Sequence, residues 1–322
     1  MRTLLVILFV FLASITIDVF GQSQGFGGIP KKTYLWSGKK GNTELHQESR
    51  PVSQFPPFCG KKRRNNGMVL PLPFGTGIQL SAFEQPYISS DLRMFSSANN
   101  LSARADTVDQ NTKSGEVSMT IRPDLWLFPF LNVYGIVGYA EGRTTPNLIV
   151  PSIVIENIPN IGEITIDTTF ELKDKIYYHG PAYGFGATVT TGYKEFFILL
   201  NYEYTVTDAS GLESKIKYNR FNAKFGILLG QNANKAKGAF WVGSMYMGDN
   251  HHFEGEVNVK DILPDYIIIF GDKATYSGNV KALYPWNFIF GGSLMLNDHH
   301  FVVLEMGFFR RQQISFSYTF RF

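Results

Sequence analysis

The last ten residues of the chain alternate between polar and apolar side chains without exception. The apolar positions are Ile314, Phe316, Tyr318, Phe320 and Phe322, and the positions between them carry Gln, Ser, Thr or Arg. Because successive side chains of a β-strand point to opposite faces, this pattern predicts a strand with one aromatic face and one polar face. A strand of about ten residues is also long enough to cross a bilayer when it is tilted.

Ten segments of the chain carry this alternation, and they predict an all-β fold. Their approximate bounds are 76–85, 115–127, 131–141, 183–192, 195–206, 216–229, 238–247, 286–296, 301–309 and 312–322. The connectors after the second, fourth, sixth and eighth segments are short, whereas long connectors follow the first, third and seventh. Long connectors therefore fall at one end of the array only, with both termini at the other, as in barrels with periplasmic turns and extracellular loops.

The aromatic faces of these strands suit a hydrocarbon environment, and in that environment the sheet has to close. In hydrocarbon an open sheet edge leaves backbone N–H and C=O groups unpaired, so the tenth strand should pair with the first. We therefore predict a closed antiparallel up-and-down transmembrane β-barrel. Two more alternating segments, 149–155 and 164–172, would raise the count to twelve, but their charges favour a hairpin in water. A soluble two-sheet sandwich would also alternate; strand length, the terminal Phe322 and the one-sided loops favour the barrel.

The N-terminus predicts export. Arg2 precedes an apolar run over residues 4–13, and the small residue Gly21 ends the segment, which is the pattern of a signal peptide. We expect cleavage after Gly21, so that residues 1–21 are removed and the mature chain leaves the cytoplasm. A retained N-terminal anchor helix is the alternative, but the apolar run is shorter than the roughly 18 residues that a membrane-spanning helix needs.

A basic segment follows the signal. Residues 22–66 hold nine lysines and arginines against two glutamates and are rich in Gly, Pro and Ser, which indicates a flexible periplasmic segment. The whole chain carries a formal charge of +3, so the barrel, expected over 67–322, is net negative. The basic run 61–64 is typical of a solvated flank or of a contact with anionic headgroups, and it does not identify a partner. Nucleic acid is not expected for an exported chain, and the single Cys59 excludes an intramolecular disulfide.

Composition narrows the class of protein further. The chain is 44% hydrophobic, 15% aromatic and 18% charged, which excludes a disordered chain. A mean hydropathy of −0.06 and the absence of an apolar run of about 20 residues beyond the N-terminus exclude a membrane protein built from several spanning helices.

The chain resembles the bacterial outer-membrane β-barrel superfamily, and its closing stretch, 286–308, is similar to a group of small barrels without a known activity. The resemblance rests on the signal peptide, the alternating strands over 68–322, and the final strand that ends in Phe322. It implies a location in the outer membrane of a Gram-negative bacterium, in contact with membrane lipid. It also implies that Tyr318, Phe320 and Phe322 form a signal that the barrel-assembly machinery recognises.

On this register the inner face of the barrel carries four acids and four bases. The acids are Glu116, Asp124, Glu203 and Glu305, and the bases are Arg122, Arg220, Lys224 and Arg321. Because a ten-strand lumen is narrow, we expect these charges to pair across it. Two interpretations stay open: a polar core that fills the barrel, and a porin-like passage or binding cavity for a small solute whose selectivity these eight residues set.

Catalytic patterns are sparse. The stretch 184–189 lacks the last Gly of a dinucleotide fingerprint, and 291–295 lacks the closing Gly of a nucleophile elbow. We therefore predict no catalytic residue, no cofactor and no metal; His251 and His252, which lie near Asp249, are interpreted as part of a solvated loop. The function predicted is a narrow solute passage or a surface-binding scaffold, more in keeping with a non-enzymatic protein. The alternative is an outer-membrane hydrolase acting on lipid or peptide, with Asp249, His251 and His179 at its rim.

Overall fold

The computed structural model describes residues 72–96, 101–110, 112–145, 147–158, 162–167, 169–173, 175–193, 195–210, 215–229, 237–262, 267 and 271–322. The predicted signal peptide, 1–21, and the predicted basic segment, 22–66, lie outside the described residues. No helix within these ranges has both the length and the apolar character needed to cross a membrane.

Ten antiparallel strands close into a barrel, as predicted. They are β1 (Phe74–Ser96), β3 (Thr112–Phe128), β4 (Leu131–Thr145), β8 (Ile176–Tyr193), β9 (Phe196–Thr207), β10 (Ile216–Leu229), β11 (Lys237–Asn258), β13 (Trp286–Met295), β14 (His300–Phe308) and β15 (Gln312–Arg321). Each pairs with the next in this order, and β15 pairs back onto β1. The strand count is therefore ten, and the twelve-strand alternative is wrong.

The seam between the first and last strands is paired along its full length. The register runs from Gly75 opposite Arg321 to Glu84 opposite Gln312. Beyond its end, Phe322 donates its N–H to the carbonyl of Phe74 at 3.0 Å, and the two rings stack with centroids 6.1 Å apart. No edge of the barrel sheet is left open, which is the condition for a sheet surrounded by hydrocarbon.

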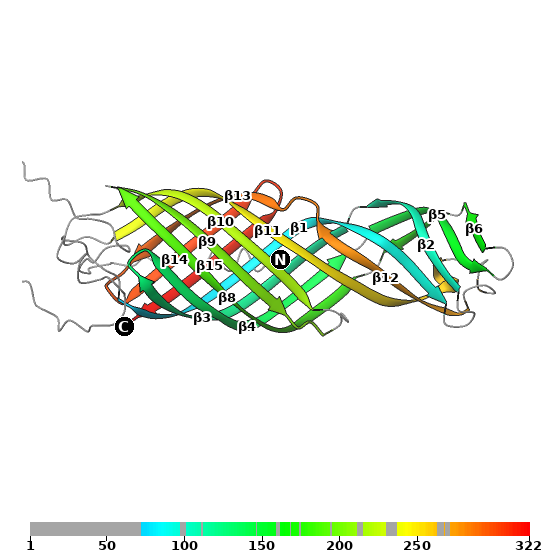
Figure 1. The fold of residues 1–322 in the computed structure, drawn as a ribbon, viewed down its shortest axis with the longest axis horizontal. Coiled ribbons are helices and arrows are strands. Elements are labelled where there is room, and N and C mark those ends of the chain that lie inside the picture. The colour runs from blue at the N-terminus through cyan, green and yellow to red at the C-terminus, as the bar shows by residue number, and fades with distance from the viewer. Residues whose placement is uncertain are drawn as a thin grey trace, which may run out of the picture.

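The long connectors are largely strand and build a lobe on one end of the barrel. Its elements are β2 (Leu101–Gln110), β5 (Asn147–Ile158), β6 (Gly162–Ile166), β7 (Phe170–Lys173), α3 (Val259–Ile262) and β12 (Lys273–Ala282). Strands β1 and β11 continue out of the barrel, β12 pairs with both extensions, and β2 and β5 extend the sheet on the other side of β1. Figure 1 shows the lobe at the end of the molecule away from the C-terminus.

Two of the sequence predictions concern residues of this lobe. The alternating segments 149–155 and 164–172 fall in β5, β6 and β7. Strand β5 pairs with both β6 and β7 outside the barrel, so the predicted extra hairpin lies there. The predicted solvated loop at His251 and His252 is wrong, because these residues belong to β11 and pair with Val280 and Asn279 of β12. The strand continues because its partner, β12, returns alongside it.

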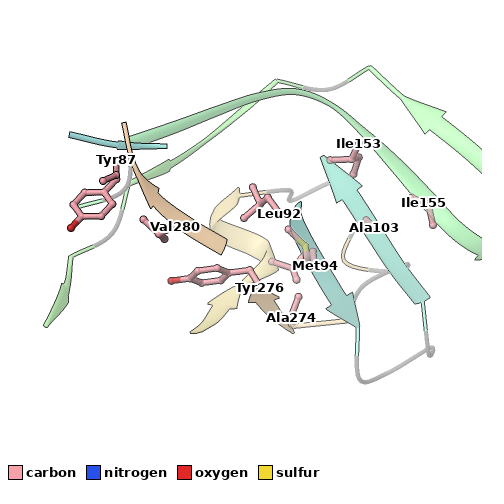
Figure 2. Close-up of a cluster of buried hydrophobic side chains, with 11 residues drawn as sticks. Tyr87, Leu92, Met94, Ala103, Ile153, Ile155, Ala274, Tyr276 and Val280 are labelled. Atoms are coloured by element: carbon pink, nitrogen blue, oxygen red, sulfur yellow. The ribbon is translucent and has the colours of Figure 1, made fainter. Parts of the chain in front are cut away.

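The lobe has a hydrophobic core of its own (Figure 2). Side chains from β1, β2, β5, β12 and α3 meet there, which gives the curled sheet an inside and an outside. The buried members are Tyr87, Leu92, Met94, Ala103, Ile153, Ile155, Val259, Ala274, Tyr276, Val280 and Ala282. Burial of a valine-, leucine-, isoleucine- or methionine-sized side chain stabilises a fold by roughly 1.5–3 kcal/mol, so the lobe is packed structure rather than a set of loops.

The outer surface of the barrel is apolar and aromatic. The alternation places one face of each strand outside, where large hydrophobic side chains stay exposed; Val137 on β4, for example, is 64% exposed. Other members of this band are Ile121, Phe185, Ile198, Phe225, Val242 and Phe290. A continuous exposed surface of this kind is far larger than soluble monomers tolerate, and it is the surface that lipid would cover.

Candidate lumen site

Glu203 is the centre of the largest charge cluster inside the barrel. Its two carboxylate oxygens accept hydrogen bonds from two arginines on other strands, Arg220 at 2.7 Å and Arg122 at 2.9 Å. The hydroxyl of Tyr134 also donates to it, at 3.4 Å. All three charged side chains are largely buried, so each relies on the others for the solvation that water would otherwise provide.

Two further ion pairs lie on the inner face. Asp124 accepts hydrogen bonds from Arg321 at 2.8 Å and from Asn132 at 2.7 Å, near the short-turn end of the barrel. Lys224 pairs with Glu305, whose carboxylate also accepts from the indole Nε1 of Trp241 at 2.9 Å. The Lys224 ammonium lies 5.3 Å from the centre of the Trp241 ring, a cation–π distance.

Glu116 differs from the other three acids, because tyrosines rather than bases hold it. The hydroxyl of Tyr218 donates to its carboxylate at 2.9 Å and that of Tyr178 at 3.4 Å.

The structure places all eight predicted residues on the inner face and brings seven of them into ion pairs. Their role in solute binding stays a prediction.

A cavity of about 290 Å³ lies along this network. It extends from Arg321 and Asp124, close to the short turns, to Arg311 and Met247, close to the lobe. The volume is at the lower end of the range for small-molecule sites, roughly 300–1,000 Å³. The polar wall and this size suit a small polar solute or a file of water molecules.

A layer of tightly packed side chains crosses the lumen between the cavity and the lobe. Phe83 on β1 and Tyr218 on β10 meet edge to face with ring centroids 5.9 Å apart, although β1 and β10 lie on opposite sides of the barrel in the strand order. They belong to a buried cluster that also contains Tyr178, Ile216 and Met247. The lumen is thus bridged from wall to wall by side chains that are almost fully buried.

Sequence reasoning missed several inward-facing residues, of which Arg311 is the most notable. It lies in the tight turn between β14 and β15 and is 0% exposed, with its guanidinium held by Gln313 at 2.7 Å and Gln85 at 3.1 Å. A turn residue has no place in a period-two pattern, and no signal in the sequence separates Arg311 from its exposed neighbour Arg310. Gln85 and Gln313 themselves follow the strand alternation and were open to prediction.

The structure separates two of the three residues predicted for a rim hydrolase, His179 and Asp249. His179 lies on the outer surface, where its Nδ1 is 2.7 Å from the hydroxyl of Tyr139 and its ring stacks on that tyrosine. Asp249 is buried inside, where it accepts a hydrogen bond from the hydroxyl of Tyr87. The side chain of His251 lies outside the described residues. Within the described part of the chain, no group of three or more His, Cys, Asp or Glu side chains is placed to hold a metal ion.

The sequence matches no protein-family model and no curated protein. Several solved structures are similar to the chain at low identity. They include the beta domain of the Bordetella autotransporter BrkA (12% identity, 77% of this chain and 99% of that one, TM-score 0.28), the Ralstonia pickettii toluene transporter TbuX (8%, 79% and 90%, 0.26) and the Escherichia coli outer membrane protease OmpT (11%, 78% and 97%, 0.25). These values are too low to transfer the activity of any of these proteins to this chain.

Proposed function

We propose that this chain is an outer-membrane β-barrel protein whose lumen is closed by its own side chains and whose lobe is a surface-binding scaffold. The membrane assignment is supported by the closed sheet and its exposed apolar outer band. Under this proposal lipid covers the band and the barrel-assembly machinery inserts the chain. The short turns face the periplasm, and the lobe stands outside the cell.

The observation that carries the scaffold role is the contact between Phe83 and Tyr218 across the lumen. An open channel needs a continuous file of water, and a buried aromatic pair between opposite walls interrupts it. The ion pairs around Glu203 narrow the lumen further. A barrel closed in this way acts as an anchor, and what it presents to the exterior is the packed lobe.

Conductance in a planar lipid bilayer tests this closure. The purified full chain, folded from detergent into the bilayer, should show no reproducible unitary conductance. The double variant Phe83→Ala/Tyr218→Ala removes both rings of the bridge and should conduct. The matched control is Tyr202→Ala, which removes an exposed ring from the outer face of β9 and should stay silent. Steady unitary conductance from the unmodified protein would contradict the closed barrel.

Location is tested separately in cells. Fractionation should recover the protein with the outer membrane, and protease added to intact cells should cut the lobe but leave the barrel. Recovery in the soluble fraction would overturn the membrane assignment.

A narrow solute passage is the second candidate, favoured by the charged cavity of about 290 Å³. It predicts small but reproducible currents from the unmodified protein. Glu203→Gln removes a negative charge from between Arg122 and Arg220, so it should then shift ion preference toward anions, measured as a change in reversal potential in a salt gradient. Currents with unchanged preference would argue against a passage lined by these residues.

A further inference from the structure

The tight turn between β14 and β15 holds Phe309 in a backbone conformation that bulky residues rarely adopt. Its φ is +102°, in the region that favours glycine. Phe309 is also 79% exposed, the most exposed of the large apolar side chains in the described part of the chain. Strain of this kind persists only where the surroundings impose it, and it collects at binding sites. The turn therefore presents an aromatic ring to the outside at a cost to its own backbone.

The turn is fixed from the inside of the barrel. Asn287 on β13 is buried, and its Oδ1 accepts hydrogen bonds from the backbone N–H groups of Arg310 and Arg311, both at 3.3 Å. Its Nδ2 donates to the carbonyl of Arg311 at 2.8 Å. The side chain of Arg311 is fully buried, whereas Phe309 and Arg310 are exposed. The inner residues thus set the conformation, and the outer two are left for contacts outside the protein.

Arg310 lies between two aromatic rings. Its guanidinium carbon is 4.2 Å from the ring centre of Tyr284 and 4.8 Å from that of Phe309, and both are cation–π distances. No carboxylate among the described residues forms an ion pair with Arg310. The rings orient the guanidinium without neutralising its charge, so its donors suit an anionic oxygen from outside, above all a phosphate.

The turn lies at the lobe-side margin of the apolar outer band. Phe308 faces Phe288 in the register of β14 and β13, and the two rings meet with centroids 5.5 Å apart. One step nearer the lobe, Trp286 is 52% exposed and its ring lies 5.3 Å from that of Tyr246. Tryptophan and tyrosine collect at the headgroup level of membrane barrels. Arg310 is therefore at the depth of lipid headgroups.

We propose that Arg310, Phe309 and Tyr284 bind the phosphate headgroup of an anionic lipid, an inference that rests on the proposed membrane location. The guanidinium donates to the phosphate oxygens, and the Phe309 ring contacts the lipid beside it. Because the turn and the two rings already hold the guanidinium in place, little ordering is required when the lipid binds. The lobe-side rim of the barrel thus selects one class of lipid from the bilayer around it.

Fluorescence quenching by brominated lipids tests the proposal, because one tryptophan lies beside the turn. Trp286 is exposed on the outer face, whereas Trp126 and Trp241 are buried. The full chain is folded into phosphatidylcholine vesicles that contain equal mole fractions of either brominated phosphatidic acid or brominated phosphatidylcholine. Quenching should show that phosphatidic acid binds about fivefold more tightly than phosphatidylcholine, the factor expected for one basic side chain near a lipid surface. Trp286→Phe should remove the difference in quenching, which assigns the signal to this rim.

Three variants locate the site, each at an exposed side chain, with folding checked by heat-modifiable migration on gels. Arg310→Gln should bring the ratio of the two binding constants close to one. Arg93→Gln removes an exposed arginine from the lobe, where β1 pairs with β12, and should leave the ratio unchanged. Tyr284→Leu keeps the charge but removes one ring from the guanidinium, and should lower the ratio about twofold or more.

The outcomes separate this proposal from the membrane assignment. A ratio near one for the unmodified protein, or equal ratios for Arg310→Gln and Arg93→Gln, would overturn the lipid site alone. An unchanged ratio in Tyr284→Leu would contradict the role of the rings. If neither brominated lipid quenched Trp286, the membrane location would be wrong, and the lipid site with it.

Discussion

Arg220 and Glu203 face each other directly across β10 and β9, where the guanidinium donates to Oε1 of the carboxylate at 2.7 Å. Arg122, from another part of the wall, takes the second oxygen at 2.9 Å. One carboxylate therefore neutralises part of the charge of two buried arginines. Glu203 is the shared ion-pair partner of the cluster. Its removal leaves the positive charges of Arg122 and Arg220 close together in a poorly solvated part of the lumen.

Glu203→Gln should therefore destabilise the barrel strongly. The substitution keeps the shape of the side chain but removes the ion-pair partner of Arg122 and Arg220, a loss that typically costs about 3–5 kcal/mol for a buried pair. Urea unfolding in lipid vesicles, followed by tryptophan fluorescence, measures the change. Glu256→Gln is the control, because the Glu256–Lys273 pair at 3.1 Å is mostly exposed and should contribute less than about 1 kcal/mol. Equal losses in the two variants would mean that the Glu203 cluster is not a structural element.

Gly138 on β4 marks a close approach between strands. A Cβ atom built there would overlap the backbone carbonyl of Met119 on β3, so Gly138→Ala should force the two strands apart and cost roughly 1–3 kcal/mol. Gly135, three residues earlier on the same strand, is the matched control: its added Cβ would meet only Pro123 Cγ at 3.6 Å, an ordinary contact. The same unfolding experiment should find Gly135→Ala close to the unmodified protein, and a Gly138→Ala variant of unchanged stability would contradict the close approach.

Most of the barrel was predictable because its two faces meet different surroundings. The segment predicted at 301–309 is β14 (His300–Phe308), and that at 312–322 is β15 (Gln312–Arg321). Each alternates because outward-facing apolar positions and lumen-facing positions follow one another. The same parity predicted which charges point inward. It did not predict that Tyr218 and Tyr178 hold Glu116, because partners across a lumen depend on which strands lie opposite.

The lobe and the turns were harder to predict. Strand β2, Leu101–Gln110, alternates between apolar and polar residues only over its first six positions, and its pairing depends on β1 and β5. Strand β12 likewise forms because β1 and β11 project out of the barrel and leave room for it between them. Arg311 carries no local signal, because its burial follows from the direction of a tight turn.

The lipid-facing band can be tested with one charge. Val137 lies on the outer face of β4 and is among the most exposed apolar side chains there. If lipid covers this face, Val137→Arg should cost about 2–4 kcal/mol near the bilayer midplane, measured as a shift of the urea midpoint in vesicles. Glu141→Arg, on the same face and closer to the lobe, exchanges one charge for another and should cost much less. A negligible effect of Val137→Arg would place that residue in water.

The variant Phe322→Ala distinguishes a role of Phe322 in assembly in the cell from a role in the stability of the folded barrel. Its backbone hydrogen bond with Phe74 survives in Phe322→Ala, and the ring contacts with Phe74 at 6.1 Å and with Phe320 at 6.2 Å are lost. An aromatic pair contributes roughly 0.5–1.5 kcal/mol beyond its buried area, so the purified variant should unfold at nearly the same urea concentration as the unmodified protein. If Phe322 belongs to the signal read by the barrel-assembly machinery, however, the amount of folded protein in the outer membrane should fall severalfold.

The control for this experiment is Phe309→Ala. Phe309 is a 79% exposed aromatic residue in the turn between β14 and β15, at the other end of the barrel from Phe322. Its loss removes a similar apolar ring but leaves the final strand intact, so the yield in the membrane should be unchanged. Because both variants are compared for yield in cells and for stability after purification, a defect confined to yield in Phe322→Ala points to recognition during assembly. Equal yields of the two variants would show that the terminal aromatic is not read, and a parallel loss of stability would assign Phe322 to the seam alone.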